Sequence, residues 1–361
     1  MHKVLVTGAA GYVGCVLVPK LLAAGHEVIG YDLMLYGDEG LPQHPRLTVV
    51  KGDIRDTAFY ASFLNEVDTV IHLACISNDP SFELDPQLSR SINFDCFEPM
   101  VKASRDAGVS RFIYVSTSSV YGVSDSPNVT EEHPLVPLTD YNKYKGLCEP
   151  QLLKYQSPEF TTVIIRPATI CGYSPRTRLD LSVNILTNLA INKRKITVFG
   201  GSQKRPNIHI NDVTDLYVKL LDYPTEKIAG QIFNAGYQNH SIAEIADMVR
   251  KVVEAEYPQL APIEIETSTS NDLRSYHISS EKIARILDFR PTRTVEDAVR
   301  DLCEAFKAGK LPNSLTDEKY FNVKVVIKKG IVKYGAENCG CHRGGRLYWQ
   351  PYGRLVTGAR V

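Results

Sequence analysis

The chain has 361 residues, of which 43% are hydrophobic and 23% are charged. Its 41 Lys and Arg residues balance its 41 Asp and Glu residues, so no overall charge favours nucleic acid or an anionic membrane as partner. No stretch approaches the roughly 18 apolar residues of a membrane span, and no signal peptide is expected because Met1–Lys3 runs directly into an apolar strand pattern. Eight cysteines lack the spacing of a disulfide framework, which indicates reduced thiols and a cytoplasmic location.

The first half of the chain alternates strand and helix patterns. The predicted strands are Lys3–Thr7, Glu27–Tyr31, Leu47–Lys51, Thr69–Leu73, Arg111–Ser116 and Thr162–Ile165. The predicted helices are Val13–Ala24, Thr57–Asn65, Pro86–Ala107 and Asn142–Tyr155. Because strands separated by helices require crossover connections, we expect an α/β fold built on a Rossmann-like, doubly wound parallel sheet.

The patterns in the second half of the chain predict a smaller lobe. Helical patterns at Ile185–Ile191, Ser241–Val253 and Thr294–Phe306 surround a strand and turn at Val198–Gly201. Strands at Ile208–Ile210 and Ile232–Asn234 are expected to return to the main sheet, so that the two lobes interleave.

A glycine-rich turn follows the first predicted strand. Gly8, Gly11 and Gly14 let the chain turn sharply, approach a pyrophosphate with bare backbone and pack a helix on the sheet. Phosphate then lies at the helix N-terminus. Asp32, at the end of the second strand, would accept both adenosine ribose hydroxyls, and no Arg or Lys between Asp32 and Arg46 would bind a 2′-phosphate. The pattern therefore favours NAD over NADP.

Tyr141 and Lys145 are four residues apart in a predicted helix, so they share one face. A tyrosine hydroxyl, with a pKa of about 10, is a poor base at neutral pH. A nearby ammonium stabilises the phenolate, and lowering the pKa by roughly three units requires about 4 kcal/mol. The pair is suited to remove a proton from a sugar or alcohol hydroxyl while a nicotinamide takes the hydride.

These features belong to a longer ordered set. It comprises TGAAGYVG at 7–14, Asp32, Gly52–Ile54, His72–Ala74, STSSVYG at 116–122, the Tyr141/Lys145 pair, RPATICG at 166–172, RPNIHINDV at 205–213, Asp272–Tyr276 and Ser280–Lys282. The set resembles the extended short-chain dehydrogenase/reductase family, and specifically its NAD-dependent nucleotide-sugar epimerases and dehydratases, such as the UDP-glucose 4-epimerases. The matches span roughly residues 3–310.

The resemblance implies roles for individual residues. Thr117 would hydrogen-bond the reacting sugar oxygen and share its proton with Tyr141, the general base, while Lys145 would hold the nicotinamide ribose. Arg205 and Arg274 would clamp the nucleotide diphosphate, with Asn184 nearby and Ser118 also contacting the substrate. The residues predicted to bind the cofactor are Gly8, Gly11, Tyr12, Val13, Gly14, Asp32, Asp53, Ile54, Leu73, Ala74, Tyr141 and Lys145.

The residues after Thr117 limit which of the possible reactions the chain can catalyse. The family's 4,6-dehydratases carry Asp-Glu there, its decarboxylases a Glu at the second position and its GDP-mannose 3,5-epimerases a Cys, whereas this chain has Ser118 and Ser119. Serine hydroxyls cannot act as acid and base unaided near neutral pH. The resemblance therefore implies an epimerase that oxidises C4 transiently, lets the keto sugar turn and returns the hydride from NADH to the other face. Reduction or dehydrogenation of a 4-keto hexose or heptose, dehydration, C2 epimerisation and a non-catalytic NAD sensor or scaffold stay open.

The chain is expected to form two lobes and a C-terminal tail. Residues 1–172 would form the NAD-binding domain, with returns near 206–235, and residues 173–205 and 236–320 the substrate-binding lobe. Residues 321–361 would be an irregular tail, and Cys339 and Cys341 lack a second ligand pair, so no metal is expected. The implied partners are a nucleotide-diphosphate sugar and a second copy of the chain, docked through Pro86–Ala107 and Asn142–Tyr155, with no nucleic acid or membrane.

Overall fold

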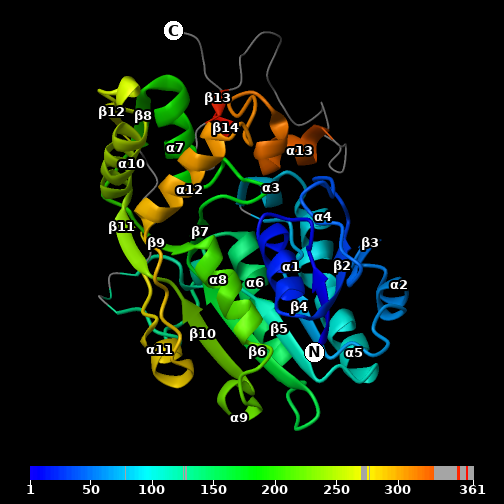
Figure 1. The fold of residues 1–361 in the computed structure, drawn as a ribbon. Helices are drawn as coiled ribbons and strands as arrows, with labels where there is room; N and C mark the ends of the chain where they lie inside the picture. The colour runs from blue at the N-terminus through cyan, green and yellow to red at the C-terminus, as the bar shows by residue number, and fades with distance from the viewer. Residues whose placement is uncertain are drawn as a thin grey trace, which may run out of the picture.

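Seven parallel strands form the central sheet of the computed structural model (Figure 1), which describes residues 1–328 except 78, 125, 127, 270–274 and 276, together with 348–349 and 355–356. The order across the sheet is β10-β6-β5-β4-β1-β2-β3. The strands are β1 Lys3–Thr7, β2 Glu27–Asp32, β3 Leu47–Lys51, β4 Thr69–His72, β5 Arg111–Val115, β6 Thr161–Pro167 and β10 Gln231–Ala235. The prediction of a Rossmann-like, doubly wound parallel sheet is confirmed.

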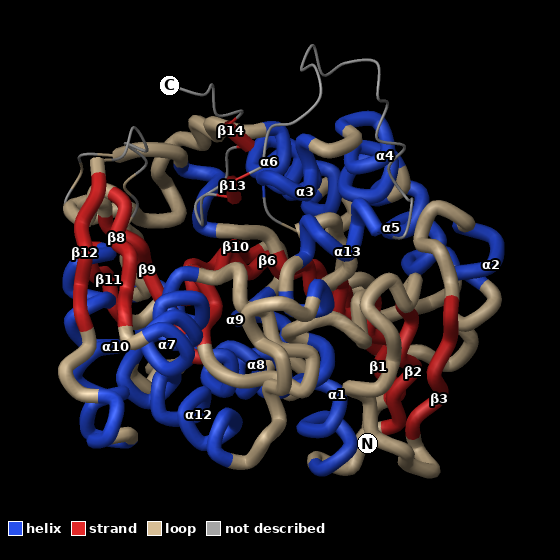
Figure 2. Tube along the Cα trace, turned by 90° about the horizontal axis from the view of Figure 1, so that it is seen from above, coloured by secondary structure: helices blue, strands red, loops and turns tan. Residues whose placement is uncertain are grey.

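Helices cover both faces of this sheet, as Figure 2 shows from above. Because successive side chains of a strand point to opposite faces, Val4 and Val6 of β1 pack on one side and Leu5 on the other. The first side carries α1 Gly14–Ala23, α8 Ile210–Lys219 and α11 Glu281–Leu287. The second side carries α2 Thr57–Ala61, α5 Phe97–Asp106 and α6 Asp140–Leu153.

A smaller group of elements packs beside the main sheet and has its own apolar core. It contains a three-stranded sheet of β7 Thr169–Cys171, β9 Lys204–His209 and β11 Gln238–Ser241, and a parallel pair of β8 Lys195–Phe199 and β12 Glu264–Ser268. Its helices are α7 Ser182–Lys193, α10 Ile242–Glu256 and α12 Val295–Lys307. The division into two lobes at the predicted boundaries stays a prediction.

One predicted return to the main sheet is wrong. The segment Ile208–Ile210 ends β9 and begins α8, and β9 pairs with β7 on one edge and with β11 on the other. Both edges of β9 are therefore occupied, so it has no free edge to offer the main sheet. The other return, Ile232–Asn234, does lie in the main sheet, within β10.

The long helix predicted at Pro86–Ala107 is interrupted. It consists of α4 Pro86–Arg90, a π-helical turn at Ser91–Asp95 and α5. In the turn, the Asn93 side chain accepts a hydrogen bond from the Ile76 amide (2.8 Å) and donates one to the Ile76 carbonyl (3.0 Å). These two bonds tie the π-helical turn to the loop after β4. The remaining short helices are α3 Asp79–Glu83, α9 Thr225–Ile228 and the 3₁₀ turns Ser118–Tyr121, Pro258–Leu260 and Glu318–Tyr320.

The predicted irregular tail is wrong for its first residues. Helix α13 Asn322–Lys328 packs beside α3, and its Val325 and Val326 form an apolar cluster with Leu35. Apolar burial thus holds this segment against the residues that follow β2. Strands β13 Tyr348–Trp349 and β14 Leu355–Val356 form an antiparallel pair, whereas Cys339, Cys341 and His342 lie outside the described residues.

Within the described part of the chain, no helix combines the length and the apolar character that crossing a bilayer requires. The cytoplasmic location stays a prediction.

Five buried thiols make the fold sensitive to alkali. Burial raises the pKa of each from the ordinary 9.0 to about 12; they are Cys15, Cys96, Cys148, Cys171 and Cys303. Between these values the folded state holds protons that the unfolded state releases, so the stabilisation is complete below about pH 9 and falls as pH rises toward 12. From pH 9 to 10 we expect a loss of about 1 kcal/mol per thiol in the free energy of unfolding.

Urea unfolding of the reduced protein at several values between pH 8 and 10 measures this loss. The Cys303→Ala variant should show a shallower pH dependence than the wild type, because one of the titrating thiols is gone. Stability that is level or rising over this range would contradict the prediction.

Candidate active site

A cleft of about 350 Å³ opens at the carboxyl ends of the central strands. Its walls come from the turn after β1, from the ends of β2, β3 and β5, from the loops after β4 and β6, and from α6 and α13. This edge, where the strand order reverses around β1 and β4, is where open parallel sheets bind their ligands.

The glycine-rich turn forms the floor of the cleft. Gly8 has φ 74°, and a Cβ there would lie 2.7 Å from the Ala74 amide nitrogen. A Cβ at Gly14 would lie 2.3 Å from the Ala9 carbonyl oxygen. Only glycine therefore allows helix α1 to start so close to the sheet. The first turn of α1 carries no acidic residue, so its N-terminus suits the phosphates of a dinucleotide.

Two carboxylates line the cleft on the β2–β3 side of this turn. Asp32 accepts hydrogen bonds from the Met34 amide (2.7 Å) and the Ala10 amide (3.1 Å). Burial raises the pKa of Asp32, although these two bonds and the charge of Arg176 oppose the rise. Asp53 forms an ion pair with Arg55 at 2.5 Å. The backbone donors hold the Asp32 carboxylate at the place where an adenosine ribose lies in this fold.

Tyr141 and Lys145 line the cleft on the β5 side. The Lys145 side chain is 3% exposed, and its Nζ donates to the Val115 carbonyl at 2.6 Å. The pKa of Tyr141 is raised well above its usual value, first by burial and then by Cys75 and Asp79, while Arg178 opposes the rise. The predicted lowering of the Tyr141 pKa by Lys145 is not found here, because burial has the largest influence on this pKa and raises it.

Thr117 also lines the cleft, but its hydroxyl does not pair with Tyr141. Its Oγ1 accepts from the Ser119 amide (3.2 Å) and hydrogen-bonds the Ser119 hydroxyl (2.8 Å). Ser119 in turn donates to Asn142 Oδ1 at 2.5 Å. Ser118 is 5% exposed and does not line the cleft. The 3₁₀ turn at Ser118–Tyr121 thus directs Ser119 rather than Ser118 toward the predicted catalytic residues.

The cleft brings together all twelve residues predicted to bind the cofactor, and Thr117 with them. Asn184 lies elsewhere, since it is fully buried in α7, accepts from the Gly172 amide (3.0 Å) and donates to the Arg178 carbonyl (2.8 Å). Arg205 is 8% exposed on β9 and also does not line the cleft. Arg274 lies outside the described residues. Of the predicted substrate contacts, none of the three described ones reaches the cleft, so their direct role stays a prediction.

The sequence prediction missed many of the residues that line the cleft. Among them are the polar or ionisable residues Tyr36, Cys75, Arg176, Arg178 and Asn322. The available signal was the pair of arginines at 176 and 178, which stand just before Asp180. Arg178 is 8% exposed and forms an ion pair with Asp180 at 2.8 Å.

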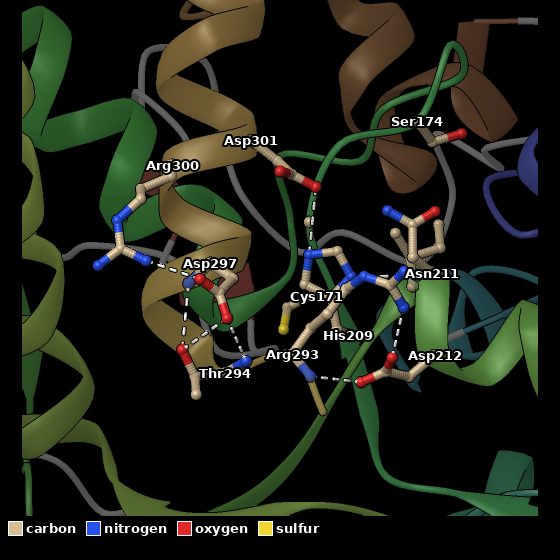
Figure 3. A network of polar contacts seen from close by, with 12 residues as sticks. Cys171, Ser174, His209, Asn211, Asp212, Arg293, Thr294, Asp297, Arg300 and Asp301 are labelled. Atoms are coloured by element: carbon tan, nitrogen blue, oxygen red, sulfur yellow. Dashed lines mark hydrogen bonds and ion pairs between the residues drawn. The ribbon is translucent and has the colours of Figure 1, made fainter. Parts of the chain in front are cut away.

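The segment Arg205–Val213 has a structural use that Figure 3 makes visible. His209 caps α8 by accepting from the Asn211 amide (3.1 Å), and its Nε2 lies 3.2 Å from Asp301 of α12. Asp212 forms an ion pair with Arg293 at 2.5 Å, and Arg293 stands just before the start of α12. These contacts join α8, which packs on the main sheet, to α12 of the smaller group.

A buried ion pair joins α6 to β6 next to the cleft. Glu149 of α6 and Arg166 of β6 are joined by two hydrogen bonds (2.9 and 2.5 Å), with both side chains 3% exposed. Glu149 also accepts from the Ser116 hydroxyl at 2.7 Å, and Arg166 donates to the Tyr121 hydroxyl at 2.6 Å. The pair therefore fixes both sides of Thr117 and anchors the helix that carries Tyr141.

The family model for the NAD-dependent epimerase/dehydratase family matches residues 4–236, which include the glycine-rich turn and the Tyr141/Lys145 pair. The chain belongs to this family. It is therefore an NAD-dependent enzyme of the epimerase/dehydratase type, and the prediction of NAD as the cofactor is confirmed. The glycine cradle, the α1 N-terminus and Asp32 are the described residues that fit this cofactor.

The names of similar proteins give more than one reaction. The chain is 31% identical over 266 residues to a protein named uncharacterized UDP-glucose epimerase YtcB of Bacillus subtilis, covering 69% of this chain and 82% of that one. It is 26% identical over 318 residues to UDP-glucose 4-epimerase of Lactobacillus helveticus, covering 82% and 94%. The crystal structure of DesIV, a dTDP-glucose 4,6-dehydratase from Streptomyces venezuelae, shares the fold with a TM-score of 0.74 at 24% identity, covering 85% and 98%.

Proposed function

We propose that the protein is a nucleotide-sugar epimerase that transiently oxidises C4 of its substrate. The observation that carries this proposal is the distribution of ionisable groups along the cleft. Tyr141 and Lys145 line the β5 side together with Thr117, whereas the only carboxylates among the described lining residues, Asp32 and Asp53, stand on the β2–β3 side. A reaction that needs one base and no carboxylic acid suits this arrangement.

NAD, when bound, supplies a reversible hydride acceptor. Tyr141 would take the proton of the sugar's 4-hydroxyl and give it back after the keto sugar has turned. The Thr117 hydroxyl, which already exchanges hydrogen bonds with Ser119, would hold the reacting oxygen. The Lys145 ammonium puts a positive charge at the same end of the cleft as Tyr141. Apolar residues such as Ala168 and Ile170 restrict the access of water to this end.

Dehydration is the second candidate, and one observation favours it. The charge of Asp79 raises the pKa of Tyr141, so this carboxylate lies near the predicted base, and it accepts a hydrogen bond from Thr139 at 2.7 Å. A carboxylate beside the base is the kind of group that expelling water from a sugar requires. Asp79 does not line the cleft, however, so epimerisation is the better supported of the two.

A substrate panel in deuterated water distinguishes these reactions. UDP-glucose and UDP-galactose are tested first because the names of two relatives specify UDP-glucose. The GDP, dTDP and CDP sugars follow. We expect interconversion of a C4 epimer pair without net NADH and without deuterium at C4, since the same hydride returns. A 4-keto-deoxy product carrying solvent deuterium would establish dehydration instead, and net NADH with an oxidised sugar would establish a dehydrogenase. Purified protein with NAD bound that turns over none of these sugars would contradict the proposal.

We further infer that the enzyme acts as a homodimer through α5 and α6. These helices lie side by side on one face of the sheet, and Leu147 of α6 is 42% exposed.

We also propose that Arg205 and Arg274 contact the nucleotide of the substrate. This contact would require the residues around β9 to rearrange.

A further inference from the structure

Arg176 is a buried cation without an anion. It is 8% exposed, lines the cleft, and forms no ion pair with a carboxylate among the described residues. Its Nε has no hydrogen-bond partner in the described part of the chain. Its neighbour Arg178 is equally buried but is paired with Asp180. A buried charge without a counter-charge is costly. The contrast between the two arginines therefore indicates that an anionic ligand pairs with Arg176.

The surroundings of Arg176 fix the guanidinium in one place. Its Cζ lies over the Tyr36 ring, 3.7 Å from the ring centre, and one terminal nitrogen donates to Asn322 Oδ1 at 2.5 Å. Asn322 is held in turn, because its Nδ2 donates to Ser77 Oγ at 2.8 Å and its backbone amide to Asp180 at 3.2 Å. A guanidinium fixed in this way loses little entropy when it binds a forked acceptor such as a phosphate.

The loop that carries Arg176 is attached to the glycine-rich turn. The Tyr12 hydroxyl donates to the Gly172 carbonyl, and the Ser174 hydroxyl donates to the Tyr12 carbonyl, both at 2.7 Å. Arg176 follows two residues later, close to Cys15 in the first turn of α1 and near enough to Asp32 to act on the pKa of its carboxyl. The guanidinium and the α1 N-terminus therefore stand on the same part of the cleft.

We propose that Arg176 binds the diphosphate bridge of the dinucleotide together with the N-terminus of α1. The α1 N-terminus offers backbone N–H groups to the phosphates, and Arg176 adds forked donors and a full positive charge. Asn322 acts as a positioning residue for Arg176, so helix α13 completes the cofactor site. The proposal rests on NAD as the family's cofactor and not on the proposed epimerisation, so either can fail without the other.

Calorimetric titration of nucleotide-free, full-length protein tests the assignment with three probes. ADP carries the diphosphate, adenosine carries no phosphate, and 2′-AMP carries only a 2′-phosphate. In the Arg176→Met variant we expect ADP and NAD to bind about 10- to 100-fold more weakly, as for the loss of a hydrogen bond to a charged group, while adenosine changes by less than about threefold. The matched control Arg285→Met removes an exposed arginine of α11 and should bind all probes as the wild type does.

Other outcomes overturn the proposal. Equal weakening of ADP and adenosine would show that Arg176 only shapes the cleft. Tight binding of 2′-AMP that is lost in Arg176→Met would place a 2′-phosphate there, and with it a preference for NADP. If Arg176→Met does not fold, arginine labelling of the wild type with phenylglyoxal, read by peptide mass spectrometry, still decides. ADP should protect Arg176 and adenosine should not, and equal protection by both would contradict the assignment.

Discussion

The Tyr141→Phe variant is expected to lose turnover by a factor of about 10² to 10⁴, the usual contribution of a positioned general base. Phenylalanine keeps the ring that fills this part of the cleft and removes only the hydroxyl that would accept the substrate proton. Retention of NAD should change little, because the glycine cradle, Asp32 and the α1 N-terminus are untouched. Turnover of the substrate found by the panel, together with nucleotides released on denaturation, measures both effects.

The pH dependence of the wild type gives an independent test of the same role. Burial and the neighbouring Cys75 and Asp79 raise the pKa of Tyr141, so the phenol of the free enzyme is protonated at neutral pH. We therefore expect kcat/KM to rise with pH below the alkaline range in which the fold weakens, and this rise should be absent in Tyr141→Phe. The control Tyr144→Phe changes the same group on the same helix outside the cleft. If Tyr141→Phe retained activity within a few-fold of that control, Tyr141 would not be the base.

The Glu149→Gln variant is expected to lose about 3–5 kcal/mol of the free energy of unfolding, because it leaves Arg166 charged, buried and without a counter-charge. Both side chains of this pair are 3% exposed, so water cannot replace the lost carboxylate. Chemical denaturation near neutral pH measures the change. The Glu98→Gln variant is the matched control, since Glu98 pairs with Lys154 at the surface with side chains 36% and 50% exposed. Because water screens such a surface pair, its loss should change stability far less than loss of the buried pair does.

A double replacement separates the charge from the packing. Glu149→Leu combined with Arg166→Met removes both charges, and apolar substitutes for a buried pair are often neutral or stabilising. The double variant should therefore be more stable than Glu149→Gln, although the Ser116 and Tyr121 hydroxyls lose partners. Equal losses for Glu149→Gln and Glu98→Gln would show that the buried pair is unimportant for stability.

Local patterns were sufficient to predict the sheet and the floor of the cleft. Strands buried on both faces have continuous apolar runs, which is why β1, β2 and β5 were recognised within a residue or two. The glycine turn and Asp32 are close in sequence to the strands that position them. Tyr141 and Lys145 are four residues apart, so their spacing predicts that they share a helix face, and that face lines the cleft.

Contacts between distant segments could not be predicted in this way. Arg176 meets Asn322 across 146 residues of chain, and neither residue belongs to a periodic pattern that points to the cofactor. The direction of Lys145 toward Val115 and the choice of Ser119 over Ser118 depend on the end of β5 and the 3₁₀ turn that follows it. The place of β9 depends on which strand edges are free, and the sequence alone does not show this.

The position of α13 has a consequence for the order in which the cofactor site is assembled during synthesis. The glycine turn, Asp32 and the Tyr141/Lys145 pair lie in the first half of the sequence, so they leave the ribosome first. Asn322, which orients Arg176, follows Arg176 by 146 residues. If Arg176 binds the diphosphate as proposed, a growing chain that has not yet reached α13 should hold NAD more weakly than a chain that contains it.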